Sequence, residues 1–141
     1  MGDRAVVHVA VGIVVDAAGA VLIARRPDHV HQGGLWEFPG GKVEAGESVA
    51  VALRRELHEE LGIAVQTAEP WMHVRHAYAD KTVLLDVWRV QSYDGEAQGR
   101  EGQALAWVMP AALADWSFPA ADRAIIDALT AVAAPSDHAA R

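Results

Sequence analysis

The stretch that decides the fold is residues 41–63, GKVEAGESVAVALRRELHEELGI. Ser48 is a favoured N-cap residue and Gly62 a favoured residue just past a helix end, so we expect a helix over Val49–Leu61. At 3.6 residues per turn, leucines spaced by four lie on one face of that helix. This apolar stripe predicts that the helix packs against a core through Leu53, Leu57 and Leu61.

Three carboxylates share another face of the same helix. Glu56, Glu59 and Glu60 are spaced three and four apart, a spacing at which like charges repel, and Arg55 can brace one of them. They also lie in the second half of the helix, where the dipole disfavours negative charge. Crowded carboxylates without Cys or His suit a hard cation such as Mg²⁺, Mn²⁺ or Ca²⁺. The alternative is an ordinary solvated acidic face.

Strand patterns flank this helix on both sides. We expect an early hairpin of Val6–Val15 with Val21–Ala24, followed by an extended piece at 36–38 that Pro39-Gly40-Gly41 breaks. Later elements are expected as strands at Val74–Tyr78, Thr82–Val90 and Leu105–Val108, and as a terminal helix at Pro119–Ala134 with Ile125, Ile126 and Leu129 as its apolar stripe. The irregular alternation predicts one α/β domain with a mixed sheet over residues 1–134 and a disordered tail over 135–141.

Composition narrows the class of protein. The chain has 141 residues, room for one domain, with 52% hydrophobic and 22% charged residues, as in globular proteins. Its formal charge of −7 argues against a dedicated duplex-DNA binder. The absence of cysteine excludes disulfides and thiolate metal sites, and we expect a cytoplasmic protein. The longest apolar run, Ala5–Val15, is too short to span a bilayer.

The acidic helix sits in a longer pattern. Gly41, Glu47 and the run Arg55-Glu56-Leu57-His58-Glu59-Glu60-Leu61-Gly62-Ile63 resemble the Nudix box without a departure. The resemblance implies an α/β/α sandwich around a mixed sheet and Mg²⁺-dependent hydrolysis, with Mn²⁺ able to substitute, of a nucleoside diphosphate linked to another group. It also implies that Glu56, Glu59 and Glu60 ligate the metal, that Arg55 orients a glutamate, and that Gly41 supplies a backbone ligand.

Other segments resemble the MutT-type subgroup of that family. They are Arg25-Arg26, residues 36–42 (WEFPGGK), residues 99–103 (GREGQ) and residues 118–121 (FPAA). That subgroup cleaves 8-oxo-dGTP to the monophosphate and pyrophosphate, which removes a mutagenic precursor. The resemblance implies a role for Glu101 as a further metal ligand or general base. It also implies that Arg26 and His31 line the nucleotide and that Phe38 packs near the base. Lys42 is a further candidate, as a contact to phosphate oxygens.

One position departs from the subgroup pattern, which carries Asn where this chain has Asp122. An amide both donates and accepts, so it can pair with O6 and N7–H of 8-oxoguanine together, whereas an ionised carboxylate only accepts. Asp122 would match O6 only if burial kept it protonated. The alternative is that Asp122 simply lies in the first turn of the terminal helix, where negative charge is favoured.

We therefore expect a pyrophosphohydrolase in which Glu56 or Glu101 is the general base. The expected substrate is 8-oxo-dGTP; dCTP, 5-methyl-dCTP and ADP-ribose are the alternatives within the family. A nucleotide-sensing module without turnover and a lesion-DNA recognition domain are the alternatives of other classes. We expect no stable nucleic acid complex, no membrane association, and a monomer, with a dimer as the alternative.

Overall fold

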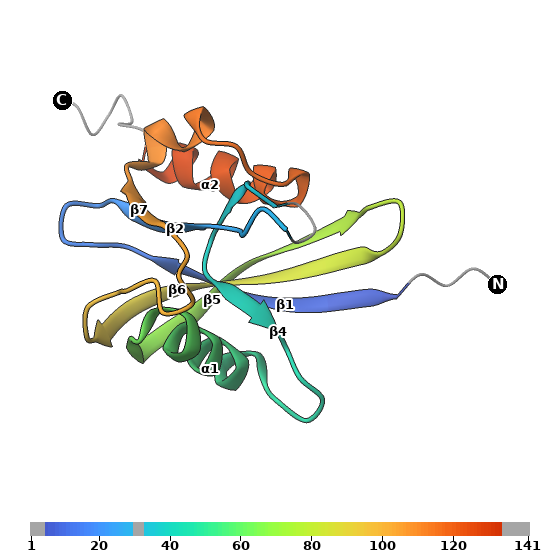
Figure 1. Ribbon diagram of the computed structural model, residues 1–141, viewed down its shortest axis with the longest axis horizontal. Helices are drawn as coiled ribbons and strands as arrows, with labels where there is room; N and C mark the ends of the chain where they lie inside the picture. The colour runs from blue at the N-terminus through green and yellow to red at the C-terminus, as the bar shows by residue number, and fades with distance from the viewer. Residues whose placement is uncertain (1–4, 30–32, 134–141) are drawn as a thin grey trace.

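The computed structural model describes residues 5–29 and 33–133. Its sheets lie between one helix on each side (Figure 1). The elements in chain order are β1 (Val6–Val14), β2 (Val21–Arg25), β3 (Trp36–Glu37), β4 (Gly40–Lys42), α1 (Val49–Leu61), β5 (Ala64–Ala77), β6 (Thr82–Asp94), β7 (Leu105–Val108), the 3₁₀ turns η1 (Pro110–Asp115) and η2 (Ala120–Asp122), and α2 (Arg123–Ala133).

The strands form two sheets. The larger has the order β4-β1-β6-β5, with β1 and β6 parallel and the other pairs antiparallel. The smaller is antiparallel, in the order β3-β2-β7. Helix α1 covers one side of this arrangement and α2 the other (Figure 1). The predicted α/β/α sandwich with a central mixed sheet is therefore confirmed.

The predicted early hairpin is wrong. β1 pairs with β6 from Val6 to Val14 and with β4 from Val9 to Val11, so β6 and β4 take its two edges. β2 pairs with β3 and β7 in the other sheet, and only the isolated bridge Val15–Val21 joins the two predicted partners. The chain therefore passes from one sheet to the other at the turn between β1 and β2, because β6 and β4 pair with β1 in place of β2.

The predicted break at Pro39-Gly40-Gly41 is also wrong in part, because β4 begins at Gly40. The neighbouring strand β1 stabilises this short strand, which contains two glycines. The Gly12 N–H donates to the Pro39 carbonyl at 2.8 Å, and Ala10 pairs with Gly41. This pairing places the glycines beside the central strand, at the edge that faces α1.

Each helix packs in one of the two clusters of buried hydrophobic side chains that form the core. The leucine stripe of α1 is buried, as predicted, against Ala10, Val14 and Val90 of the mixed sheet. The other half contains the predicted stripe of α2, namely Ile125, Ile126 and Leu129. These two clusters fix both helices relative to the strands, and therefore fix which side chains can reach the space between them.

Several element bounds differ from the expectation. β5 starts at Ala64, ten residues before the predicted Val74, and pairs with most of β6. η1 was not predicted, and the terminal helix begins at Arg123 after the separate turn η2. The predicted tail at 135–141 lies outside the described residues. Among the described helices, none is long and apolar enough to cross a membrane.

Candidate active site

Local signals in the sequence set the position of α1. The Ser48 side chain accepts a hydrogen bond from the Val51 N–H at 3.2 Å, which caps the first turn. Gly62 has φ of 75° and its N–H donates to the His58 carbonyl at 3.0 Å, which ends the helix in the left-handed conformation that favours glycine. With both ends and the leucine face fixed, Glu56 and Glu60 in the second half of the helix are directed toward β4.

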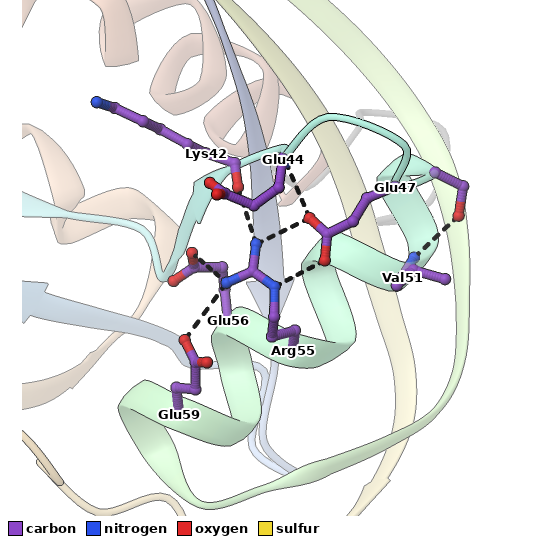
Figure 2. Close-up of polar contacts among 8 residues, drawn as sticks. Lys42, Glu44, Glu47, Val51, Arg55, Glu56 and Glu59 are labelled. Atoms are coloured by element: carbon purple, nitrogen blue, oxygen red, sulfur yellow. Dashed lines mark hydrogen bonds and ion pairs between the residues drawn. The ribbon is translucent and has the colours of Figure 1, made fainter.

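Arg55 connects this helix to the loop before it (Figure 2). Its guanidinium donates to Glu47 at 2.7 and 2.9 Å, to Glu56 at 3.0 Å, to Glu59 at 3.4 Å and to the Lys42 carbonyl at 3.0 Å. Arg55 therefore contacts two of the three helix glutamates, Glu56 and Glu59, where one was expected, and it also contacts Glu47. In Figure 2 the Lys42 side chain extends away from this cluster, while its carbonyl takes part in it.

Of the three carboxylates that Arg55 contacts, Glu47 is the one whose pKa is lowered. Its hydrogen bonds from Arg55, and a further one from the Glu44 N–H at 2.9 Å, lower the pKa of Glu47 to about 2. The contact with Glu47, in turn, is the main reason that the pKa of Arg55 is raised. Glu47 is thus a permanent anion that orients Arg55, and Arg55 orients the helix glutamates.

Gly41 allows β4 to approach the acidic face. A Cβ atom at this position would overlap the Glu56 carboxyl group, so a larger residue would push the strand and the helix apart. The neighbouring Gly40 N–H donates to Glu60 Oε1 at 3.3 Å. The backbone of β4 and the carboxyl groups of Glu56 and Glu60 therefore lie together, as the resemblance to the Nudix box implies.

The carboxylates themselves are poorly compensated. Burial raises the pKa of Glu60 to about 8, with further increases from Glu56, Glu37 and Glu101. Burial also raises the pKa of Glu56, against the opposing effect of Arg55. Such crowding of oxygen ligands without enough nearby positive charge is what a bound divalent cation would relieve, so these residues fit the metal that the Nudix box implies.

The other predicted metal ligands lie at the margin. Glu59 is on the outer side of the helix, with its side chain 54% exposed, and Glu101 is exposed on the loop before β7, where its N–H donates to the Gln103 side chain. Within residues 5–29 and 33–133, no three His, Asp or Glu side chains already form a group that could hold a metal ion. The complete ligand set therefore stays a prediction.

A pocket of about 280 Å³ extends from these glycines along the α2 side of the mixed sheet. Gly41 and Glu60 line one end of it, and Asp122 and Ala121 line the other. Of the predicted substrate contacts, Arg26, Phe38, Lys42 and Asp122 all line this pocket. His31 lies outside the described residues, so its predicted contact is untested.

The end of the pocket away from α1 is apolar with a few buried charges. Phe38 stacks on Phe118 with ring centroids 5.2 Å apart, and Arg26 donates to Glu37 at 2.9 Å. Burial raises the pKa of Glu37, an effect that Arg26 opposes. Asp122 is 8% exposed, and burial, with a smaller contribution from Glu37, raises its pKa to about 7.

Three pocket residues with polar or charged side chains were missed by the sequence reasoning: Glu37, Tyr78 and Lys81. Glu37 could have been found, because a carboxylate between Trp36 and Phe38 is unusual in an apolar extended piece. The Tyr78 hydroxyl accepts a hydrogen bond from the Ala121 N–H at 3.1 Å. No local signal marks Tyr78 or Lys81, since they reach the pocket only through the pairing of β5 with β6.

A comparison with protein families agrees with this geometry. A family model described as the NUDIX domain matches residues 10–128. The chain belongs to the Nudix hydrolase family. Nudix hydrolases generally need a divalent metal, and a small-molecule nucleotide substrate is consistent with membership.

Individual relatives place this Nudix hydrolase near the MutT-type enzymes. It is 37% identical to the CTP pyrophosphohydrolase of Escherichia coli K12, over 90% of this chain and 96% of that protein. It is also 37% identical to the 8-oxo-dGTP diphosphatase of Haemophilus influenzae, over 90% and 93%. A solved structure from a study of MutT from Aliivibrio salmonicida and Vibrio cholerae matches with a TM-score of 0.79 and 40% identity, over 90% of this chain and 98% of the other.

Proposed function

We propose that this Nudix hydrolase is a Mg²⁺-dependent nucleoside triphosphate pyrophosphohydrolase that converts 8-oxo-dGTP to 8-oxo-dGMP and pyrophosphate. The observation that carries the proposal is the single pocket that joins Glu60 and Gly41 at one end to Phe38 and Asp122 at the other. A nucleotide can place its phosphates at the acidic end and its base at the apolar end. Relatives named 8-oxo-dGTP diphosphatase support the choice of base.

The acidic end would hold the metal through Glu56, Glu59, Glu60, Glu101 and the Gly41 carbonyl. Bound there, Mg²⁺ would neutralise charge on the triphosphate and polarise its phosphoryl oxygens. Mn²⁺ offers similar oxygen coordination and could replace it. A cation is required on electrostatic grounds as well, because these carboxylates would otherwise repel a polyanion.

The general base and the phosphate contacts would come from side chains of this chain. We favour Glu56 over Glu101 as the general base for the attacking water, because the Glu56 carboxyl lies against Gly41 and is oriented by Arg55, whereas Glu101 is exposed. Arg26 and Lys42, which line the pocket, would bind phosphate oxygens.

A second candidate substrate is dCTP or its 5-methyl derivative. It is favoured by Asp122, whose ionised carboxyl can accept from an amino group but cannot donate to a keto oxygen. The relative named CTP pyrophosphohydrolase supports it. With either substrate, the proposed role is the removal of unwanted nucleotides from the cytoplasmic pool. We propose that the protein acts as a monomer and has no nucleic acid or membrane partner.

The test is a set of initial rates with Mg²⁺ on 8-oxo-dGTP, dGTP, dCTP, 5-methyl-dCTP and ADP-ribose, with products separated by chromatography. We expect the highest kcat/KM for 8-oxo-dGTP, with monophosphate and pyrophosphate as products. A higher value for dCTP or 5-methyl-dCTP would select the second candidate. Binding of nucleotides without any turnover would replace the enzyme with a sensing module.

A further inference from the structure

The loop of residues 98–103, on which one of the predicted metal ligands lies, is attached to the C-terminal end of α1. The Gln98 N–H donates to the Leu61 carbonyl at 2.9 Å, and the Arg100 N–H donates to the Glu60 carbonyl at 3.0 Å. Both carbonyls lie in the last turn of α1, where the helix itself offers them no partner. The loop is therefore bound to the same turn of the helix that carries the pocket glutamate Glu60.

The Gln103 side chain adds a bridge to these backbone contacts. Its Nε2 donates to the Glu60 carbonyl at 3.1 Å, and its Oε1 accepts from the Glu101 N–H at 2.9 Å. One amide group thus connects the backbones of two predicted metal ligands that come from different parts of the chain. The bridge needs a donor and an acceptor on the same side chain, which an amide provides and an ionised carboxylate or an apolar side chain does not.

The turn before Gln103 is tight enough to return the chain to the helix. The Gly102 N–H donates to the Gly99 carbonyl at 3.0 Å, and Gly102 has φ of 82°, which favours glycine. A Cβ atom at Gly99 would overlap the Gln103 carbonyl. The two glycines therefore allow the close packing within the loop that places the Gln103 amide between Glu101 and the helix.

Glu101 lies within electrostatic reach of the acidic end of the pocket. Burial is the largest cause of the raised pKa values of Glu56 and Glu60, and the charge of Glu101 raises both further. Glu101 itself is exposed, so its side chain has little packing of its own to fix it. The position of its carboxyl group therefore depends on the backbone that Gln103 holds.

We propose that Gln103 is a positioning residue, whose amide holds the Glu101 loop on the last turn of α1 and so places the Glu101 carboxyl group for metal binding at the acidic end. This inference rests on the proposed function, in which Glu101 is a metal ligand. Removing a hydrogen-bond partner that orients a metal ligand typically costs roughly 10- to 100-fold in metal affinity or activity. If Gln103 only stabilised the fold, its removal would have the same effect with or without Glu101.

A double-mutant cycle distinguishes these two roles. The proteins are the wild type, Gln103→Leu, Glu101→Gln and the double variant. Gln98→Leu is the control in the same loop, because the Gln98 side chain is exposed and its backbone alone forms the contacts described above. Two quantities are measured for each protein: the dissociation constant for Mn²⁺ by calorimetry without nucleotide, and kcat for 8-oxo-dGTP with Mg²⁺.

We expect Gln103→Leu to raise the Mn²⁺ dissociation constant and to lower kcat, each roughly tenfold. In the Glu101→Gln background the same substitution should change either quantity by less than about twofold, because the ligand that Gln103 positions is already lost. Gln98→Leu should match the wild type. Equal factors in the two backgrounds, or no effect of Gln103→Leu in the wild-type background, would overturn the inference.

The two measurements separate this inference from the proposed function. Hydrolysis of 8-oxo-dGTP together with an unaffected Glu101→Gln would overturn the role of Gln103 and leave the proposed function standing. Coupled effects on Mn²⁺ binding in a protein that hydrolyses no nucleotide would overturn the proposed function and support the role of Gln103. If Gln103→Leu lacks a cooperative unfolding transition, Gln103→Asn, whose amide is one methylene shorter, replaces it in the cycle.

Discussion

Arg55 shows how one residue can organise an active site without reaching the substrate pocket. It contacts Glu47, Glu56, Glu59 and the Lys42 carbonyl, and it is absent from the pocket lining. Its partner Glu47 is a fixed anion, whereas within the part of the chain that the structure describes the Glu60 carboxyl on α1 receives only the Gly40 N–H. Of the helix glutamates, the one that lines the pocket is thus Glu60, which Arg55 does not contact, as expected of a group held for a cation.

Glu60→Gln tests that role. We expect kcat to fall by at least about a hundredfold, because the amide removes a charged ligand, while the melting temperature is unchanged or higher because like-charge crowding is relieved. Rates and thermal unfolding are measured beside Glu96→Gln, an exposed loop acid that should alter neither. Near wild-type turnover in Glu60→Gln would contradict the assignment of the acidic helix to catalysis.

Asp122→Asn also has a consequence for stability. The pKa of Asp122 is about 7 in the folded chain, above its usual value of 3.8, so proton binding favours the folded state and ionisation disfavours it. The cost is absent below about pH 4, grows as the pH rises, and is complete above about pH 7. Asn carries no such cost.

We therefore expect the stability advantage of Asp122→Asn over the wild type to be about 2–3 kcal/mol larger at pH 8 than at pH 5. Urea unfolding at the two pH values measures it, with Asp127→Asn as the exposed control. An advantage that does not change with pH would show that Asp122 titrates in the folded chain as it does in the unfolded one.

At the scale of elements, α1 has one face that packs in the core and another that carries the candidate catalytic glutamates. Its leucines are buried against the mixed sheet, and Glu56 and Glu60 lie toward β4. A change on one face should therefore alter stability and a change on the other should alter catalysis. The caps at Ser48 and Gly62 set where the helix begins and ends, and therefore help to fix both faces relative to the strands.

Leu57→Ala tests the buried face. Leu57 is 0% exposed, so truncation should leave a cavity and lower the free energy of unfolding by about 2–5 kcal/mol. The matched control is Val51→Ala on the same helix, which is 52% exposed and should change stability by no more than about 0.5 kcal/mol. Equal losses in the two variants, measured by urea unfolding, would contradict the division of faces.

At the scale of the whole molecule, the pocket draws on both sheets and on the segment that leads into α2. β4 and α1 supply its acidic end, β3 supplies Glu37, and η2 supplies Asp122. The acidic end needs β4 packed against the helix α1, so it exists only in the folded state. A metal that binds there must therefore stabilise the whole domain.

We expect Mg²⁺ at a hundred times its dissociation constant to raise the free energy of unfolding by about 2.7 kcal/mol, seen as a higher melting temperature. The effect should be weaker in Glu60→Gln. NaCl at matched ionic strength is the control for general screening. An equal shift with NaCl would indicate that the carboxylates do not form a specific site.

The sequence by itself determined the parts that depend on near neighbours. The start and end of α1, its leucine stripe, the clustered glutamates and the Nudix box are all local patterns, and β7 and the apolar stripe of α2 were found in the same way. The predicted ligands Glu59 and Glu101 are family residues at matching positions, and their role still awaits a test.

Tertiary structure alone decided which strands are neighbours and which polar groups lose their water. The turn at 16–20 favours a hairpin locally, but β6 and β4 take the edges of β1. The sequence leaves Asp122 open between a contact with the base and an ordinary acid in a first helical turn, and only the fold shows that it is buried in the pocket, where burial and Glu37 raise its pKa. Strand pairing and burial sum contacts between residues far apart in the chain, and no window of local sequence contains that sum.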